Sequence, residues 1–163
     1  MARMHVLIDT SIFLHILRAP GYENPTQEAS LAKCMEHLLE SGAVLYLPLT
    51  TILETGNHIG HMPHGGERRR AAQHFVNRIQ EALDGKAPWH VAPFVDENAL
   101  KRYLAEFESY AVQGLGLGDV LLIKDAAKRL SEFAQARGEA VCIWTLDKAL
   151  RAYSPTPCPP PCR

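Results

Sequence analysis

The chain alternates short apolar runs with longer segments in which apolar residues recur every three or four positions. The apolar runs are Val6–Ile8, Ala43–Leu47, Trp89–Val95 and Ala140–Thr145. Each is short and continuous, which is typical of a strand buried on both faces of a sheet. We expect Pro93 to interrupt the third run, because proline cannot donate to a strand ladder.

Helical spacing predominates elsewhere in the chain. In the segment 96–112 the inward positions are expected to be Leu100, Tyr103, Leu104 and Phe107, and in 119–136 they include Phe133. Because strands alternate with helices, the crossovers should be right-handed and the sheet mainly parallel. The pattern predicts an α/β fold, a three-layer α/β/α sandwich with a small sheet. The predicted helices are 12–17, 27–40, 50–59, 67–83, 96–112, 119–136 and 147–153.

The length of 163 residues suits one domain, which we assign to residues 1–153. The remaining segment, 154–163, reads SPTPCPPPCR and is expected to be disordered or polyproline-like. Cys34 and Cys142 lie in apolar patterns, where a free thiol packs as a small hydrophobe. Without a secretory signal, no disulfide framework is predicted.

The net charge and the hydropathy argue against two classes of protein, those coated nonspecifically with nucleic acid and those that span a membrane. The 17 basic and 18 acidic residues give a net charge of −1, which argues against a strong nonspecific coat of nucleic acid but allows a local basic surface. No apolar run approaches the roughly 20 residues needed to span a bilayer. We therefore expect a soluble, cytoplasmic protein without a membrane partner.

Four carboxylates stand at comparable points of the predicted fold. Asp9, Glu54 and Asp147 follow strands, so a parallel sheet would deliver them to one edge, and Asp119 opens a helix that leads back toward that edge. Each of the last three has a structural explanation. Glu54 stands three residues after Thr51, as in a capping box, while Asp119 and Asp147 can cap helices. Asp9 is not needed as a cap, since the next two residues carry hydroxyls that can take that role.

Converging carboxylates repel one another unless a cation lies between them. A hard divalent ion such as Mg²⁺ takes oxygen ligands from a few carboxylates together with substrate phosphates. Such an ion can activate water and stabilise charge that develops on a phosphate. The four acids therefore predict a Mg²⁺ site that acts on a phosphate-containing substrate.

Four sequence stretches, taken together, resemble the PIN domain over residues 4 to about 153. They are the first strand with DTS, then PLTTILE, GLGLGDVLLIKDAAKR and VCIWTLDKAL. The resemblance implies a metal-dependent ribonuclease, most often the VapC-type toxin of a bacterial toxin–antitoxin pair. It further implies an RNA substrate, a cognate antitoxin and a homodimer. The segment 57–85 and the Pro/Cys-rich end depart from a minimal toxin.

On this resemblance, Asp9, Glu54, Asp119 and Asp147 correspond in order to the acids of the family, and all four are assigned as catalytic. The implied reaction is phosphodiester hydrolysis. Asp9, Asp119 and Asp147 would hold one or two Mg²⁺ or Mn²⁺ ions, and Glu54 would ligate a metal or orient the attacking water. Three small polar residues would support the site: Thr10, Ser11 and Thr145.

Basic and histidine residues offer weaker candidates. Lys124 and Lys148 are near the acids in sequence and are predicted substrate contacts. The run Arg68, Arg69 and Arg70 is a further candidate for contact with RNA, although a solvated helix face is its default explanation. The histidines of HIGHMPH are expected to be exposed rather than to hold zinc, because proline breaks their shared face. We interpret the glycines of GLGLGD as a flexible break and not as a phosphate-binding loop, since the Walker lysine is missing.

Two other functions remain open. The chain could be a catalytically silent PIN-like module with a binding or assembly role, although all four acids are present. It could also be another Mg²⁺-dependent phosphoester hydrolase, such as a haloacid-dehalogenase-type phosphatase, but that family needs a second aspartate where Ser11 stands.

Overall fold

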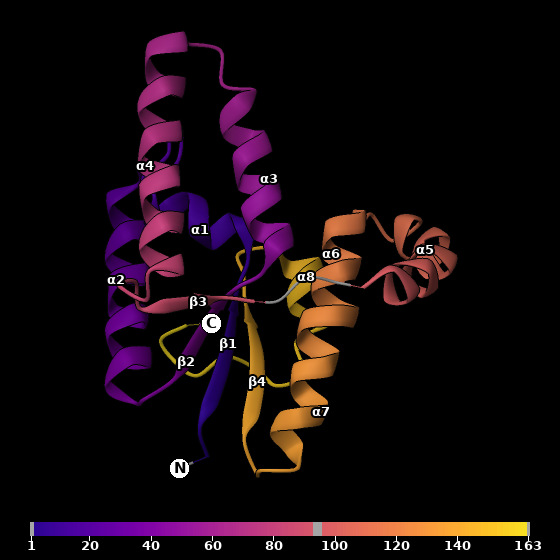
Figure 1. The fold of residues 1–163 in the computed structure, drawn as a ribbon. Coiled ribbons are helices and arrows are strands. Elements are labelled where there is room, and N and C mark those ends of the chain that lie inside the picture. The colour runs from indigo at the N-terminus through magenta and orange to yellow at the C-terminus, as the bar shows by residue number, and fades with distance from the viewer. Residues whose placement is uncertain (1, 93–95, 163) are drawn as a thin grey trace.

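A four-stranded sheet forms the centre of the molecule, with helices on both of its faces (Figure 1). The computed structural model describes residues 2–92 and 96–162. In chain order the elements are β1 (Met4–Ile8), α1 (Thr10–Ile16), α2 (Pro25–Glu40), β2 (Val44–Leu47), α3 (Leu49–Gly60), α4 (Gly65–Leu83), β3 (Trp89–Val91), α5 (Glu97–Ala111), α6 (Leu117–Leu121), the π-helix η1 (Leu122–Lys128), α7 (Arg129–Gln135), β4 (Ala140–Trp144) and α8 (Lys148–Arg151).

The strands run in the order β3-β2-β1-β4, and every pair is parallel. The predicted α/β fold with a small parallel sheet is therefore confirmed. In register, His5 of β1 lies beside Val44 of β2 and Val141 of β4. Since all strands point the same way, their carboxyl ends meet at one edge, where the chain leaves β1, β2 and β4 toward the candidate acids.

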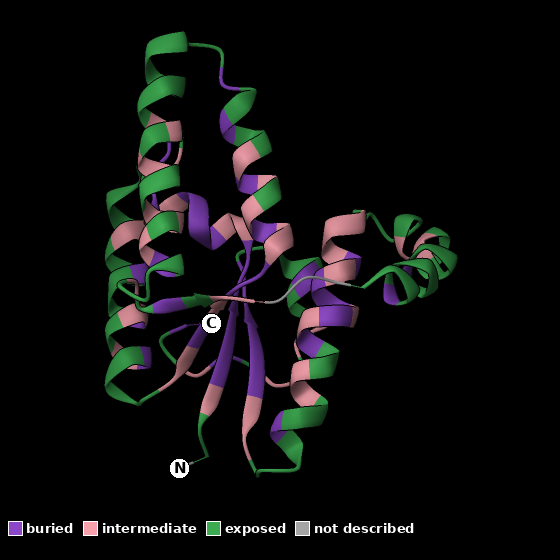
Figure 2. Ribbon diagram, in the orientation of Figure 1, coloured by how far each residue is buried: buried purple, intermediate pink, exposed green. Residues whose placement is uncertain are grey.

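Alternate residues of β1 build separate cores on the two faces of the sheet. Val6 and Ile8 pack with residues of α1 and α2, including Phe13 and Leu38. Leu7 faces the other way, into a cluster with η1, α7 and β4. Figure 2 shows buried positions along the central strands and on the helix sides that face them. Both faces of β1 are thus covered, which explains its continuous apolar run.

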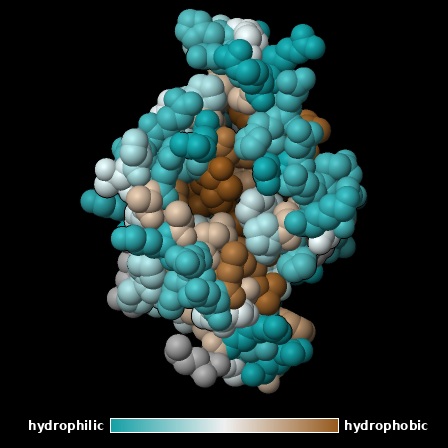
Figure 3. All heavy atoms as spheres, turned by 90° about the vertical axis from the view of Figure 1, so that its left-hand side faces the viewer, coloured by the Kyte–Doolittle hydropathy of each residue, from teal (hydrophilic) through white to brown (hydrophobic). Residues whose placement is uncertain are grey.

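The second face is covered less completely beside β2 and β3, and an apolar groove of about 450 Å³ remains there. Leu100, Leu104 and Phe133 were predicted to point inward but are 36%, 50% and 57% exposed, whereas Tyr103 and Phe107 pack as expected. Figure 3 shows the opposite face of the sheet, where α2 and α4 lie, with apolar side chains in a central hollow between hydrophilic margins. The groove residues used below are Tyr46, Leu53, Leu100, Leu121, Leu130 and Phe133.

The end of the chain corrects the expectation of a disordered tail, because residues 154–162 pack along β4. The N–H of Ile143 donates to Ser154 Oγ at 2.8 Å, and the N–H of Thr156 donates to Val141 O at 2.9 Å. These bonds occupy backbone groups on the side of β4 away from β1, where an edge strand would otherwise expose them.

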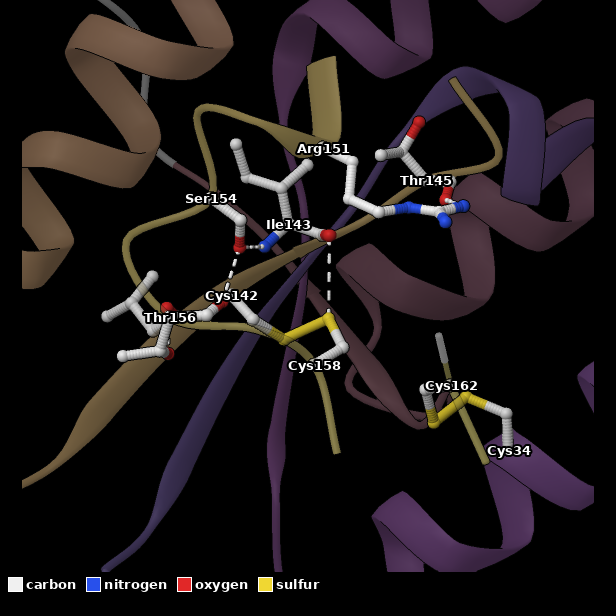
Figure 4. The surroundings of a disulfide bond; sticks show 10 residues. Cys34, Cys142, Ile143, Thr145, Arg151, Ser154, Thr156, Cys158 and Cys162 are labelled. Carbon is white, nitrogen blue, oxygen red and sulfur yellow. Dashed lines mark hydrogen bonds between the residues drawn. A yellow bond between two sulfur atoms is a disulfide. The ribbon is translucent and has the colours of Figure 1, made fainter. Parts of the chain in front are cut away.

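Two disulfides fasten this segment, so the prediction of free thiols is wrong as well (Figure 4). Cys34 on α2 bonds to Cys162, and Cys142 in β4 bonds to Cys158; both tail cysteines are buried. Spacing along the sequence does not show that α2 and the chain end meet. That proximity depends on the path of the last ten residues.

Helix formation from 117 to 135 is continuous but not uniform. A π-helical segment, η1, separates α6 from α7, although the apolar spacing predicted one regular helix. Such segments are uncommon and occur frequently near functional sites. Within η1, Asp125 is buried and accepts from Tyr103 Oη at 3.2 Å and from Arg129 Nη1 at 2.7 Å, which ties the segment to α5.

Candidate active site

Asp9 is buried at the carboxyl end of β1, where three donors converge on one of its oxygens. Oδ2 accepts from Thr145 Oγ1 at 2.7 Å, from Ser11 Oγ at 2.8 Å and from the N–H of Ser11 at 3.4 Å. The last bond makes Asp9 the N-cap of α1, so the expectation that the following hydroxyls would spare it that role is wrong. Among the described residues no hydrogen bond is made to Oδ1, which leaves this oxygen for a ligand.

Glu54 lies on α3, the helix that follows β2. Its carboxylate reaches the same edge of the sheet as Asp9. Its Oε2 accepts from Thr10 Oγ1 at 3.0 Å. The predicted capping box is not formed, because Pro48 is the N-cap and Thr51 instead donates to Ile8 O at 2.8 Å. Burial raises the pKa of Glu54; the bond from Thr10 opposes this, and the charges of Asp119 and Asp9 raise the pKa further.

Asp119 is half-buried in the first turn of α6. Its Oδ2 accepts the N–H of Gly116 at 2.9 Å, so it ties down the loop that precedes the helix. Burial raises the pKa of Asp119, the Gly116 bond lowers it, and the charges of Asp9 and Asp147 raise it. The expected capping contribution of Asp119 therefore exists, but its carboxylate also faces two other acids.

Asp147 is the exposed N-cap of α8, where Oδ1 accepts the N–H of Ala149 at 2.8 Å. Its own N–H donates to Thr145 Oγ1 at 3.0 Å. Ser11 Oγ accepts the N–H of Leu146 at 3.0 Å in the same turn. Thr145 and Ser11 thus connect the ends of β1 and β4, and they fix Asp9 and Asp147 relative to each other.

The structure brings the four predicted acids together at the carboxyl edge of the sheet, each within electrostatic range of at least one other. In the part of the chain that is described, none of Asp9, Glu54, Asp119 and Asp147 forms an ion pair with a lysine, arginine or histidine. The proximity of these like charges and the raised pKa values of Glu54 and Asp119 are the properties of a site that gains from a bound cation.

The donors at this edge are oxygen atoms, the ligand type that Mg²⁺ and Mn²⁺ prefer. Within residues 2–92 and 96–162, no three His, Cys, Asp or Glu side chains are arranged closely enough to form a ready-made metal cage. Mg²⁺ usually keeps several waters and is held through one or two carboxylates, so it does not require such a cage. All-oxygen donors, with one carboxylate oxygen of Asp9 unbonded, fit that mode of binding.

The predicted basic contacts are dispersed. Lys124 Nζ pairs with Glu106 at 2.8 Å and lies 5.6 Å from the centroid of the Tyr110 ring, so it faces α5. Lys148 is exposed at the start of α8, directly after Asp147.

The arginine run 68–70 lies in the first turns of α4, at the end of the α3–α4 hairpin that projects from the sheet (Figure 1). Arg68 donates to Met62 O at 2.9 Å and closes the hairpin turn. His58, His61 and His64 are all exposed, as expected, and the His58 ring lies against Tyr22 at 5.2 Å between centroids. Lys148 is the one basic residue that stands directly next to any of the four acids in the sequence.

No sequence model of a known family matches the chain, and no curated protein matches it. Among solved structures, the chain is similar to FitAB bound to an IR36 DNA fragment, with 21% identity, a TM-score of 0.53, and coverage of 87% of this chain and 97% of that one. It is also similar to FitAcB from Neisseria gonorrhoeae, with 16% identity, a TM-score of 0.52 and 91% of each chain covered. At these identities the likeness establishes a shared fold.

Proposed function

We propose that this protein is a Mg²⁺- or Mn²⁺-dependent endoribonuclease of the PIN type and the toxin of a type II toxin–antitoxin pair. The observation that carries the nuclease is the cluster of four carboxylates without a cationic partner, at the edge where parallel α/β sheets bind ligands. The PIN-like sequence stretches and the two neighbours of the same fold support this proposal. The toxin role, the RNA substrate and the antitoxin rest on the sequence resemblance.

Asp9 and Asp119 would hold the metal, with Asp147 contributing directly or through water. A bound divalent cation would lower the pKa of a water molecule and stabilise charge on the scissile phosphate. Thr145 and Ser11 keep Asp9 in one orientation by donating to Oδ2. Glu54, held by Thr10, would ligate the metal or orient the attacking water. The cytoplasmic location expected from the sequence is part of this proposal. No helix in the described part of the chain has the length and apolarity to cross a membrane.

The test is an RNA cleavage assay with Mg²⁺ or Mn²⁺, repeated with EDTA and with Asp9→Asn. We expect EDTA or the substitution to reduce the rate by at least about 100-fold, because the cluster would lose its central ligand. The exposed Asp84→Asn serves as a matched control and should cleave normally. Cleavage that survives both EDTA and Asp9→Asn would remove the metal-site proposal. Wild-type protein that binds Mn²⁺ but cleaves no RNA would instead indicate a silent binding module.

We also propose that the protein is a homodimer and that a second copy covers the apolar groove. The groove is bordered by projecting side chains. Leu53 on α3 and Phe133 on α7 line it and are 56% and 57% exposed. A surface that carries a hollow and a projection side by side can complement itself across a two-fold axis. Large exposed apolar patches are uncommon on monomers, which favours a covered surface.

A further inference from the structure

Gly118 lies against the carboxylate of Glu54 with no room between them for a side chain. A Cβ placed on Gly118 would lie 2.7 Å from Glu54 Cδ and 3.5 Å from Cγ, and it would overlap Oε1 itself. Real Cβ atoms essentially never approach a carboxyl carbon that closely. Of the glycines in the chain, Gly118 is the one whose Cβ would meet a neighbour inside 3.4 Å.

The backbone conformation does not explain this glycine. Gly114 and Gly138 have positive φ values of +81° and +68°, which side chains rarely tolerate. Gly118 is inside α6 with a φ outside that range, so alanine would suit the backbone there and would favour the helix. The methyl group of alanine would have no space, because α6 approaches α3 at the position of the Glu54 carboxylate.

Glu54 is therefore held from two sides. Thr10 donates to Oε2 at 3.0 Å, and the backbone of α6 at Gly118 borders Oε1. Asp119, the next residue, carries a candidate metal ligand on the same turn. If Glu54 were displaced, its distance from Asp119 and Asp9 would change, and so would the arrangement of oxygens offered to a cation.

We propose that Gly118 is a positioning residue, whose missing side chain lets Glu54 enter the acid cluster beside Asp119 and so maintains the affinity of the cluster for a divalent cation. This inference rests on the proposed metal-dependent function. It changes the interpretation of GLGLGD, since Gly118 is required for close approach and not for flexibility.

The first experiment measures Mn²⁺ affinity by calorimetry or by EPR for wild type, Gly118→Ala and Gly60→Ala. Gly60 is the matched control, because it is also helical, it lies on α3 with Glu54, and a Cβ there meets nothing within 4 Å. We expect Gly118→Ala to weaken Mn²⁺ binding by roughly 10- to 100-fold, the usual range for residues that orient ligands, and Gly60→Ala to bind as wild type does. A folded Gly118→Ala protein with wild-type affinity overturns the inference.

The second experiment is a double-substitution cycle without metal, read as Tm. Gly118→Ala should raise Tm in the Glu54→Ala background, where alanine favours the helix and the obstructing carboxylate is gone, and it should give a smaller gain or a loss in wild type. An equal change of Tm in both backgrounds means that Gly118 acts through another contact and overturns the inference. If wild type binds no Mn²⁺, the metal-dependent function fails by itself, and the cycle still decides whether Gly118 positions Glu54.

Discussion

Thr145 donates its hydroxyl hydrogen to Asp9 Oδ2 at 2.7 Å and so joins the ends of two neighbouring strands across 136 positions of sequence. Thr145 Oγ1 in turn accepts the N–H of Asp147 at 3.0 Å. One small side chain therefore orients one acid and anchors the turn that carries another. Its position follows from the parallel pairing of β1 with β4, which places Ile8 beside Trp144 immediately before the two residues.

We predict that Thr145→Val weakens both the fold and the site. Valine has the same shape but no hydroxyl, so the buried Asp9 loses a donor and the N–H of Asp147 loses its acceptor. Leaving such groups unsatisfied costs about 1–3 kcal/mol of unfolding free energy. Urea denaturation measures this loss, and Thr145→Ser should restore most of it. If valine and serine behave alike, the hydrogen bonds do not matter for stability.

A second prediction concerns pH. The pKa of Glu54 is raised by burial, and neighbouring acids add to this. An acid whose pKa is higher in the folded than in the unfolded protein destabilises the fold when it is ionised in both states. That penalty applies above its folded-state pKa and disappears as the pH falls below the unfolded-state value of about 4.

Glu54→Gln should therefore raise the Tm of metal-free protein at pH 7 by about 2–4 °C, because the amide keeps an acceptor for Thr10 but carries no charge. The gain should vanish near pH 4, and the exposed Glu36→Gln should give no comparable change. With saturating Mn²⁺, wild type should instead have a higher Tm than Glu54→Gln. A Glu54→Gln gain that is independent of pH would contradict the electrostatic explanation.

A third prediction concerns the disulfides. Cys34–Cys162 and Cys142–Cys158 join residues 128 and 16 positions apart. The chain-entropy relation assigns about 3 kcal/mol to the shorter loop and about 4–5 kcal/mol to the longer one. Reduction should therefore lower Tm and release residues 154–162 from β4, which limited proteolysis would detect. Titration of thiols in the unreduced protein should find none, and four reactive thiols with an unchanged Tm would contradict the pairing.

The same experiment bears on the cellular location. Structural disulfides are typical of oxidising compartments, whereas the sequence predicts a cytoplasmic protein. Trapping thiols in living cells with an alkylating reagent would show whether the two bonds form there. In a reducing compartment the segment would be retained by its hydrogen bonds to Val141 and Ile143.

A fourth prediction tests the proposed dimer. Phe133→Glu places a charge in the lining of the apolar groove and should convert the dimer to a monomer. Light scattering during gel filtration measures this change. Val76→Glu is the matched control, because Val76 is also 57% exposed but lies on α4 and not among the groove residues. A wild-type monomer would rule out the dimer, and a dimer that survives Phe133→Glu would place the interface on another surface.

The strands and the four acids could be predicted from sequence because both depend on local pattern. A continuous apolar run ending at Asp9 indicates a buried strand whatever follows, and a parallel arrangement then takes Glu54 and Asp147 to the same edge. Asp119 could be added because its helix leads into β4. The polar residues around Asp9 were also visible, although the sequence did not show that Asp9 itself caps α1.

Tertiary structure decided the features that depend on contacts between distant segments. The pairing of Cys34 with Cys162, the exposure of Phe133 and the contact between Gly118 and Glu54 have no signature in spacing, because each depends on how two elements meet in space. The same apolar periodicity describes a helix face that is covered and one that is left open. Local pattern therefore determined which residues could form the site, whereas packing between α3 and α6 decided how closely they approach.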